Sequence, residues 1–302
     1  MARRGGAPGG AAVPVSNPRM WSSGTQRRAR RRFSLRHRPF LIVGVTICLL
    51  IALVAILSPV LAPFDPIKPN VPAALQAPSA THLFGTDALG RDLLSRVLYG
   101  ARVSYLSAVL ATLIGCLIGS VVGLTAGFVG GVIDNVLMRI MDALYAFPTL
   151  VLAIAVVATL GPGTAQTVAA IAIVAIPRYA RVMRAQTLGQ RHREFVLAAQ
   201  VVGAHPLRVA GRHILPNTLG IIVVLASASA GFAVLTEASL SFLGLGTQPP
   251  TPDWGSMLKD GVQFLQQAQW LAIFPGVAIS VLVLGFNLLG DGVRDLLDPR
   301  MR

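Results

Sequence analysis

Apolar residues occur in this chain in stretches long enough to cross a lipid bilayer. A transmembrane helix needs about 20 mostly apolar residues with few charges. Reading from one charged residue to the next gives candidate helices at 39–64, 103–133, 143–177, 214–236 and 261–290. The third stretch holds two helices, because a Gly-Pro-Gly sequence at 161–163 breaks it. The pattern therefore predicts an all-α, polytopic membrane protein with six transmembrane helices.

The fourth of these helices is short, because its apolar stretch runs from Thr164 only to Arg178. The distribution of Lys and Arg among the loops nevertheless supports it, since cytoplasmic loops are enriched in both residues. With six spans the cytoplasmic side holds 21 of them and the outside 5, whereas without the fourth span the numbers become 12 and 14. The sequence thus predicts six crossings with both termini in the cytoplasm.

The composition excludes an ordinary soluble enzyme, because 54% of the residues are hydrophobic and 13% are charged, against about 25% in soluble domains. The net charge of +14 comes mainly from the N-terminus, where residues 1–39 hold ten arginines and no acid. We expect residues 1–38 to form a disordered cytoplasmic tail that anionic lipids attract, not a nucleic-acid-binding surface. A twin-arginine export signal is disfavoured, because the following apolar run exceeds a signal core of about 7–15 residues.

The sequence carries no motif for catalysis or metal binding. It has no HExxH, no GxSxG and no His/Cys cluster with metal-ligand spacing. Its two lysines, Lys68 and Lys259, do not follow a glycine, so no Walker A loop can hold ATP phosphates. We expect no cofactor and no enzymatic activity on this chain; if ATP drives transport, the nucleotide binds another polypeptide.

The loop at 178–213, between the fourth and fifth predicted spans, holds seven arginines and one acid, Glu194. Residues 194–203 predict a short amphipathic helix that ends at Gly203, a favourable residue after a helix C-terminus. A second short helix is expected to start at His205-Pro206 and to run to Arg212. Small residues and a basic rim predict that this segment fits into a groove of another protein.

Few charged or polarisable side chains lie at membrane depth. Met138, Asp142 and Glu237 are the candidates for lining a pathway or gate. Arg139 and Asp142 are three residues apart and are expected to pair on one helix face. Glu237 equally fits an interfacial acid that caps a neighbouring helix. The sequence offers no series of intramembrane carboxylates, which argues against a proton-coupled mechanism.

Two spacing patterns concern packing. A smooth stripe for close helix contact within the subunit is predicted by four glycines at every fourth residue, namely Gly115, Gly119, Gly123 and Gly127. In the extracytoplasmic segment 65–102, the pairs Asp87/Arg91 and Asp92/Arg96 place the acid four residues before the arginine. This order predicts two ion pairs that brace an external helix.

The cytoplasmic loop resembles the EAA loop of ABC-importer permeases, which shares the spacing of Ala198-Ala199, Gly203 and Leu215-Pro216. Two positions depart from that motif, because Leu197 replaces its Glu and His213 replaces its Ile. The resemblance implies a coupling helix that docks into a cleft of an ATPase subunit. The residues implied in this contact are Glu194, Leu197, Ala198, Ala199, Gly203, Leu215 and Pro216.

Three further segments, at 82–102, 235–255 and 286–300, resemble the C-type permease of dipeptide, oligopeptide and nickel importers. The likeness covers about residues 35–300. It implies a type I ABC-importer permease (MetI-like) fold. In that fold the first transmembrane helix, at 39–64, precedes a permease core at 103–290, and 291–302 form a cytoplasmic C-terminus.

The resemblance also implies a role: half of a translocation pathway for di- or oligopeptides in the cytoplasmic membrane of a prokaryote. The implied partners are a homologous second permease, two ATPase subunits that bind ATP and Mg²⁺, and an extracytoplasmic substrate-binding protein. A nickel or other small-solute importer is the alternative, but nickel selectivity needs His, Cys or carboxylate ligands, of which the spans hold few. A secondary carrier and a membrane-embedded enzyme are the remaining alternatives.

Overall fold

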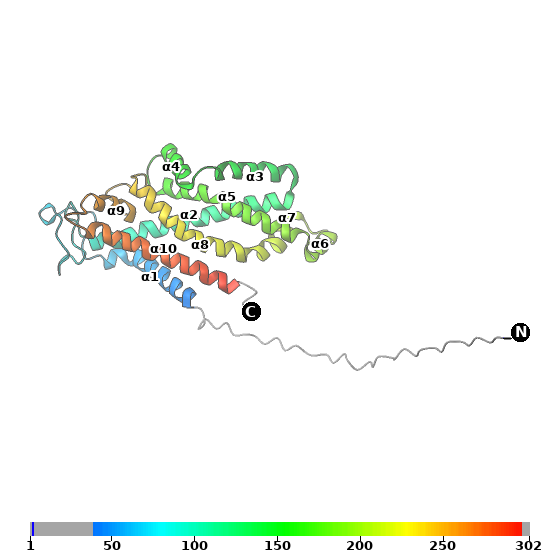
Figure 1. The fold of residues 1–302 in the computed structure, drawn as a ribbon, viewed down its shortest axis with the longest axis horizontal. Helices are drawn as coiled ribbons and strands as arrows, with labels where there is room; N and C mark the ends of the chain where they lie inside the picture. Colours follow the sequence, from blue (N-terminus) through cyan, green and yellow to red (C-terminus); the bar gives the residue numbers. More distant parts are fainter. Residues whose placement is uncertain (1, 3–38, 298–302) are drawn as a thin grey trace. The chain divides into compact units, whose positions relative to one another are not determined.

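The computed structural model describes residue 2 and residues 39–297, and within these residues the chain is almost entirely helix and loop (Figure 1). Most of the predicted tail at 1–38, and residues 298–302 of the C-terminal segment, lie outside the described residues. The helices are α1 (Pro39–Leu61), α2 (Leu93–Val129), α3 (Gly131–Tyr145), α4 (Thr149–Leu160), α5 (Thr164–Arg191), α6 (Glu194–Val201), α7 (Pro206–Val209), α8 (Leu215–Phe242), α9 (Trp254–Val262) and α10 (Trp270–Leu297), with a 3-10 turn, η2 (Val71–Ala73), and a π-helical turn, η3 (Ala210–Ile214).

The lengths and compositions of these helices confirm a polytopic membrane protein. In the part of the chain that the structure describes, α1, α2, α8 (together with α7 and η3) and α10 are long and apolar enough to span a bilayer. The pair α3–α4 makes a fifth span with a bend of 96°. α5 falls outside this set because arginines occupy its second half. The six predicted helices correspond to α1, α2, α4, α5, α8 and α10.

Several boundaries differ from those predicted. α2 begins at Leu93 rather than at 103, and α10 begins at Trp270 rather than at 261. The fourth helix is not limited to its apolar stretch: α5 continues for 28 residues, about 42 Å, so residues 178–191 of the predicted loop are helical. Reading from one charged residue to the next finds where a run of apolar side chains ends. The helix itself can continue past that point, because its backbone hydrogen bonds do not require apolar side chains.

The predicted glycine stripe packs α2 against α5, as expected for contact within the subunit. A Cβ added at Gly119 would lie 2.6 Å from both the carbonyl oxygen of Ile176 and the Cβ of Tyr179. Gly115 and Gly123 face the α5 backbone in the same way. The absence of side chains at these positions therefore brings the two helix backbones into contact, which supplies packing where lipid gives no hydrophobic driving force.

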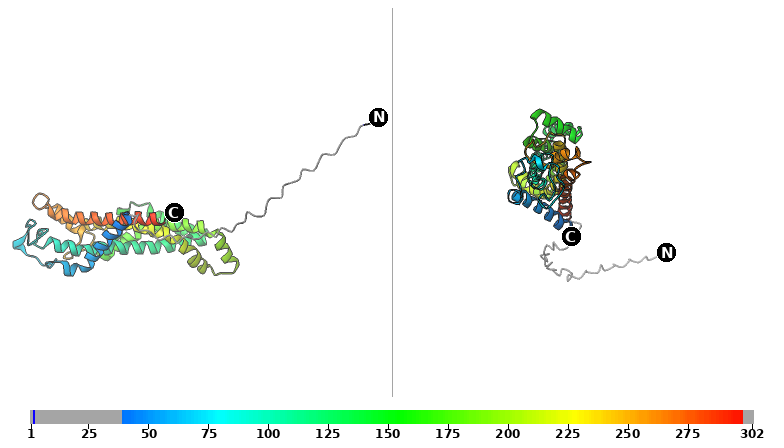
Figure 2. Two further views of the ribbon diagram at one scale, coloured as in Figure 1. Left: turned by 90° about the horizontal axis from the view of Figure 1, so that it is seen from below. Right: turned by 90° about the vertical axis from the view of Figure 1, so that its left-hand side faces the viewer.

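Contacts near the helix ends show which segments share an end of the bundle (Figure 2). Leu41, at the start of α1, packs against Gly292 near the end of α10, and a Cβ at Gly220 of α8 would touch Leu297. At the opposite end, the amide of Gly163 donates to the carbonyl of Leu245 over 3.2 Å. The start of α1, the end of α10 and the α5–α8 connection therefore lie at one end, which we call the inner end.

The inner parts of α5 and α8 project beyond α1. Gly44 of α1 packs against Leu289, and Gly290 packs against Ala228, so Ala228 lies near the level of the second turn of α1. α8 begins at Leu215, about 20 Å before Ala228, and thus extends roughly 10 Å past the start of α1. This projection explains how α5 carries arginines in its second half without burying them in lipid.

In the segment before α2, one of the two predicted ion pairs forms and the other, between Asp92 and Arg96, does not. Asp87 and Arg91 pair at 2.7 Å, as predicted. Asp92, however, is the N-cap of α2, and its carboxylate accepts hydrogen bonds from His82 and from the amide of Ser95. Arg96 instead lies 3.4 Å from Asp87. The predicted external helix does not form, because α2 begins only after Asp92 and the preceding residues are turns.

Candidate coupling surface and inner pocket

The connection between α5 and α8 contains the predicted short helix. α6 ends in a Schellman motif, in which the amide of Ala204 donates to Ala199 (3.0 Å) and the amide of Gly203 donates to Gln200 (2.9 Å). Gly203 has φ of +83°, a left-handed conformation that favours glycine. No atom lies within 4 Å of a Cβ added there, so backbone conformation and not space selects glycine at this position.

The second short helix starts at Pro206 as predicted but does not end at Arg212. α7 passes through the π-helical turn η3 directly into α8, so the connection is continuous with a transmembrane helix. A π-turn accommodates one residue more than an α-turn. Ile214 is fully buried whereas His213, which stands at the isoleucine position of the motif, is half-buried, so the buried isoleucine lies one residue later.

A small apolar cluster holds the connection in place. The side chains of Val196 in α6, Val209 in α7 and Ile214 in η3 are all fully buried and pack together. Leu124 and Phe128 of α2 close the cluster. Burying three aliphatic side chains contributes about 1.5–3 kcal/mol each, so the connection is an ordered element attached to the inner end of α2.

The outer face of this element is apolar and exposed. Val201 and Val202 are each 87% exposed, and Leu207 is 77% exposed. Phe195 and Leu197 are also exposed. We call these five residues the loop surface. The implied coupling residues lie on or beside it: Glu194, Ala198, Gly203 and Pro216 are exposed, whereas Ala199 and Leu215 are half-buried.

Ion pairs attach α3 to α5, although not the pair predicted. Asp134 forms two hydrogen bonds with Arg184, at 2.5 and 2.6 Å. Asp142 pairs with Arg181 at 2.9 Å, and this guanidinium also stacks over the ring of Tyr145. The expected partner of Asp142, Arg139, forms no ion pair in residues 39–297, because tertiary contact with α5 places a different arginine beside Asp142.

The elbow between α3 and α4 covers a cavity of about 340 Å³ that we call the inner pocket. α2, α5 and α8 form its other walls. Three side chains lining it, Thr112, Tyr179 and Ser229, bury hydroxyl oxygens that make no hydrogen bond within the described residues. Arg178 also lines the pocket and is exposed. The inner pocket is thus a mainly apolar cavity with a few buried hydroxyls and one guanidinium, at the level where α5 leaves the apolar part of the bundle.

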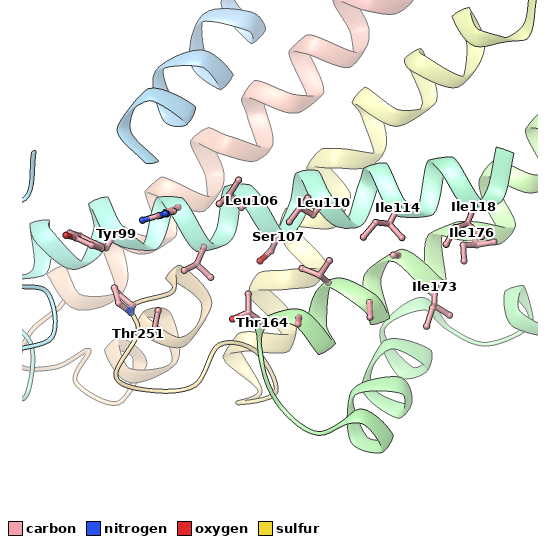
Figure 3. Close-up of a pocket in the computed structure, with 17 residues that line it drawn as sticks. Tyr99, Leu106, Ser107, Leu110, Ile114, Ile118, Thr164, Ile173, Ile176 and Thr251 are labelled. Carbon is pink, nitrogen blue, oxygen red and sulfur yellow. The ribbon is translucent and has the colours of Figure 1, made fainter. Parts of the chain in front are cut away.

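A second, larger cavity of about 920 Å³ lies along α2 and α5, as Figure 3 shows. Leu106, Leu110, Ile114 and Ile118 follow one another along its α2 side, and Ile173 lines its α5 side. These aliphatic side chains present a surface for packing and not for chemistry.

The three pathway candidates, Met138, Asp142 and Glu237, line neither cavity. Glu237 is 2% exposed in α8, where it accepts a hydrogen bond from Ser241 over 3.2 Å. The helix cap nearby belongs to Asp253, whose carboxylate accepts from the amide of Gly255 at the start of α9. Burial raises the pKa of the Asp253 carboxyl. Met138 is half-buried in α3. The hydroxyls of the inner pocket were missed by sequence reasoning that searched for charges.

Helices of this length and composition define a polytopic membrane protein, here with an ordered and exposed apolar connection at the inner end. The sequence family described as "Binding-protein-dependent transport system inner membrane component" matches residues 115–302. The chain belongs to this family. Residues 26–78 also match the N-terminal transmembrane domain of oligopeptide transport permease C.

Several curated relatives of this chain are named as peptide transport permeases. The chain is 48% identical over 267 residues to the dipeptide transport system permease protein DppC of Escherichia coli (strain K12), covering 86% of this chain and 89% of the relative. It is 44% identical over 268 residues to the protein of that name from Alkalihalophilus pseudofirmus, with coverages of 89% and 88%. A di/tripeptide transport system permease protein of Pseudomonas aeruginosa is 42% identical over 275 residues.

Proposed function

We propose that this chain is a permease subunit of an ATP-driven importer for di- or oligopeptides. The matching family is a transport component, and the relatives carry dipeptide and di/tripeptide transport in their names. In this proposal the chain forms half of the translocation pathway, and a homologous second permease forms the other half. A substrate-binding protein delivers peptide from outside.

The observation that carries the coupling part of the proposal is the loop surface. Valine and leucine side chains that are 77–87% exposed stand on an element which three fully buried side chains hold in place. An apolar surface of this kind, beside arginines, fits a partner with an apolar cleft and acidic edges. We propose that the two ATPase subunits bind ATP and Mg²⁺ and that one of them receives α6 and α7.

Force applied to the loop surface reaches the membrane helices by a short route. α7 continues through η3 into α8 without a break, and the buried cluster links the same element to α2. When the ATPase subunits close, α6 and α7 move with them and re-tilt α8 and α2, which is a rigid-body form of alternating access. The proposal places the loop surface, the start of α1 and the end of α10 in the cytoplasm.

Uptake into proteoliposomes that contain the whole complex tests this function. With the binding protein outside and ATP inside, labelled dialanine is expected to accumulate, and accumulation is expected to stop when ATP is omitted. Uptake that survives without ATP but is lost with the proton gradient would identify a secondary carrier instead. Accumulation of nickel ions but not of dialanine would favour the metal importer.

A further inference from the structure

The inner pocket brings together three buried hydroxyls without partners. Thr112 in α2 is 7% exposed, Tyr179 in α5 is fully buried and Ser229 in α8 is 9% exposed. None of these oxygens has a hydrogen-bond partner within 3.5 Å among the described residues, although the hydroxyls of Tyr179 and Ser229 lie near each other, and all three residues line the pocket. Two other serines whose buried hydroxyl oxygens have no partner among the described residues, Ser104 and Ser120, do not line it. Three helices thus contribute unpaired polar groups to one cavity.

Nearby hydroxyls show that a serine or threonine in these helices can donate a hydrogen bond to a carbonyl of its own helix. Ser227, two residues from Ser229, donates to the carbonyl of Val223 at 2.6 Å, and Thr236 donates to Phe232 at 2.9 Å. Ser229 and Thr112 do not make this bond to their own helix. Leaving a buried polar group unpaired costs about 1–3 kcal/mol. A polar molecule that enters the pocket would supply the missing partners.

The positive charge of Arg178 indicates which kind of molecule would bind in the pocket. Arg178 lines the pocket, and its guanidinium makes no ion pair among residues 39–297. A guanidinium binds a carboxylate through paired, charge-assisted hydrogen bonds, and a hydroxyl can both donate to a carbonyl and accept from an amide. The volume of about 340 Å³ lies at the small end of the range for ligand sites, about 300–1,000 Å³.

We propose that the inner pocket is a binding site for the C-terminal end of a short peptide as it crosses the membrane. Arg178 binds the carboxylate, and the hydroxyls of Thr112, Tyr179 and Ser229 bind the adjacent amide groups. The proposal rests on the proposed function, because that function supplies the peptide. It adds a substrate site on this chain, midway along α2, α5 and α8 and under the α3–α4 elbow.

The test removes single atoms in the assembled complex and measures import of labelled dialanine at saturating binding protein. Ser229→Ala and Tyr179→Phe delete one hydroxyl each, and Arg178→Gln removes the charge. Each is expected to lower uptake about tenfold, equivalent to about 1.4 kcal/mol, while assembly with the ATPase subunits and peptide-independent ATP hydrolysis stay unchanged. Thr112→Val is expected to act similarly and Thr112→Ser to restore uptake.

The matched control is Ser227→Ala, which deletes a hydroxyl that already bonds to its own helix and is expected to leave uptake within twofold of the unaltered complex. Site variants that import dialanine at the unaltered rate would overturn the pocket assignment and leave the proposed function standing. An unaltered complex that assembles, hydrolyses ATP and imports no dialanine would overturn the proposed function itself. The two failures are therefore distinguishable.

Discussion

Replacing Gly203 tests whether the shape of the α6–α7 turn couples this permease to the proposed ATPase subunits. The residue has φ of +83° and ends α6 through a Schellman motif. An L-amino acid in this conformation costs roughly 1–2 kcal/mol, and a β-branched residue is a greater outlier. Because space around a new Cβ is open, the strain is the only direct effect of the change.

The size of this strain decides how the loop responds. The buried cluster of Val196, Val209 and Ile214 contributes about 1.5–3 kcal/mol per side chain, which exceeds the strain. We therefore expect the connection to remain attached to α2 while the turn relaxes locally and tilts α6 relative to α7. A strain of about 1.4 kcal/mol already reduces the population of the original turn tenfold.

The assay is peptide uptake by the complete complex. Gly203→Ala is expected to lower uptake several-fold and Gly203→Val by tenfold or more, while the separate ATPase subunits hydrolyse ATP as before. Gly211→Ala is the control, because that glycine also has open space but lies at no positive φ. The reasoning fails if the Gly203→Val complex imports at the unaltered rate, or if Gly211→Ala is equally defective.

Two further predictions concern stability. Gly119→Val is expected to unfold or misassemble the permease, because the new Cβ would lie 2.6 Å from backbone and side-chain atoms of α5. A lowered melting temperature in detergent checks this prediction. The control Gly189→Ala, in open space on α5, should leave the melting temperature unchanged. Asp92→Ala removes the N-cap of α2 and its bond to the Ser95 amide, and should cost about 0.5–2 kcal/mol of stability. A thermal shift no larger than that of an exposed control, Asp65→Ala, would contradict the second prediction.

Patterns that repeat along one element were sufficient to predict much of this fold. The six transmembrane helices, the glycine stripe of α2 and the termination of α6 by Gly203 depend on long apolar runs, on close helix packing and on helix capping, and each of these is local in sequence. The short helix at 194–201 matches its prediction to within two residues for the same reason.

Features that depend on tertiary contact could not be predicted in this way. Asp142 was assigned to Arg139 by helix spacing, but α5 brings Arg181 to it from 39 residues away. Asp92 was assigned to Arg96, although the start of α2 turns it into a capping residue. The spacing rule for Asp92 and Arg96 assumes that both residues lie within one helix, but α2 begins after Asp92. The rule for Arg139 and Asp142 assumes a helix without neighbours, but α3 packs against α5.

The inner pocket was also invisible in the sequence, since serine, threonine and tyrosine are common in membrane helices. Ser229 differs from Ser227 in being buried on another face of α8 and in making no hydrogen bond to its own backbone, and neither difference can be read from the residue type. The one usable signal was the position of Arg178 at the end of an apolar stretch. That signal was interpreted only as the limit of the fourth span.

The central claim, that the loop surface binds an ATPase subunit, is tested most directly by placing a charge on it. Val202→Asp is expected to leave the permease folded, because the side chain is 87% exposed, and to release the ATPase subunits during affinity purification of the permease. Ala185→Asp, at an exposed position of α5 outside the loop surface, is expected to retain them. ATPase subunits that co-purify with the Val202→Asp permease in unaltered amount would contradict the claim.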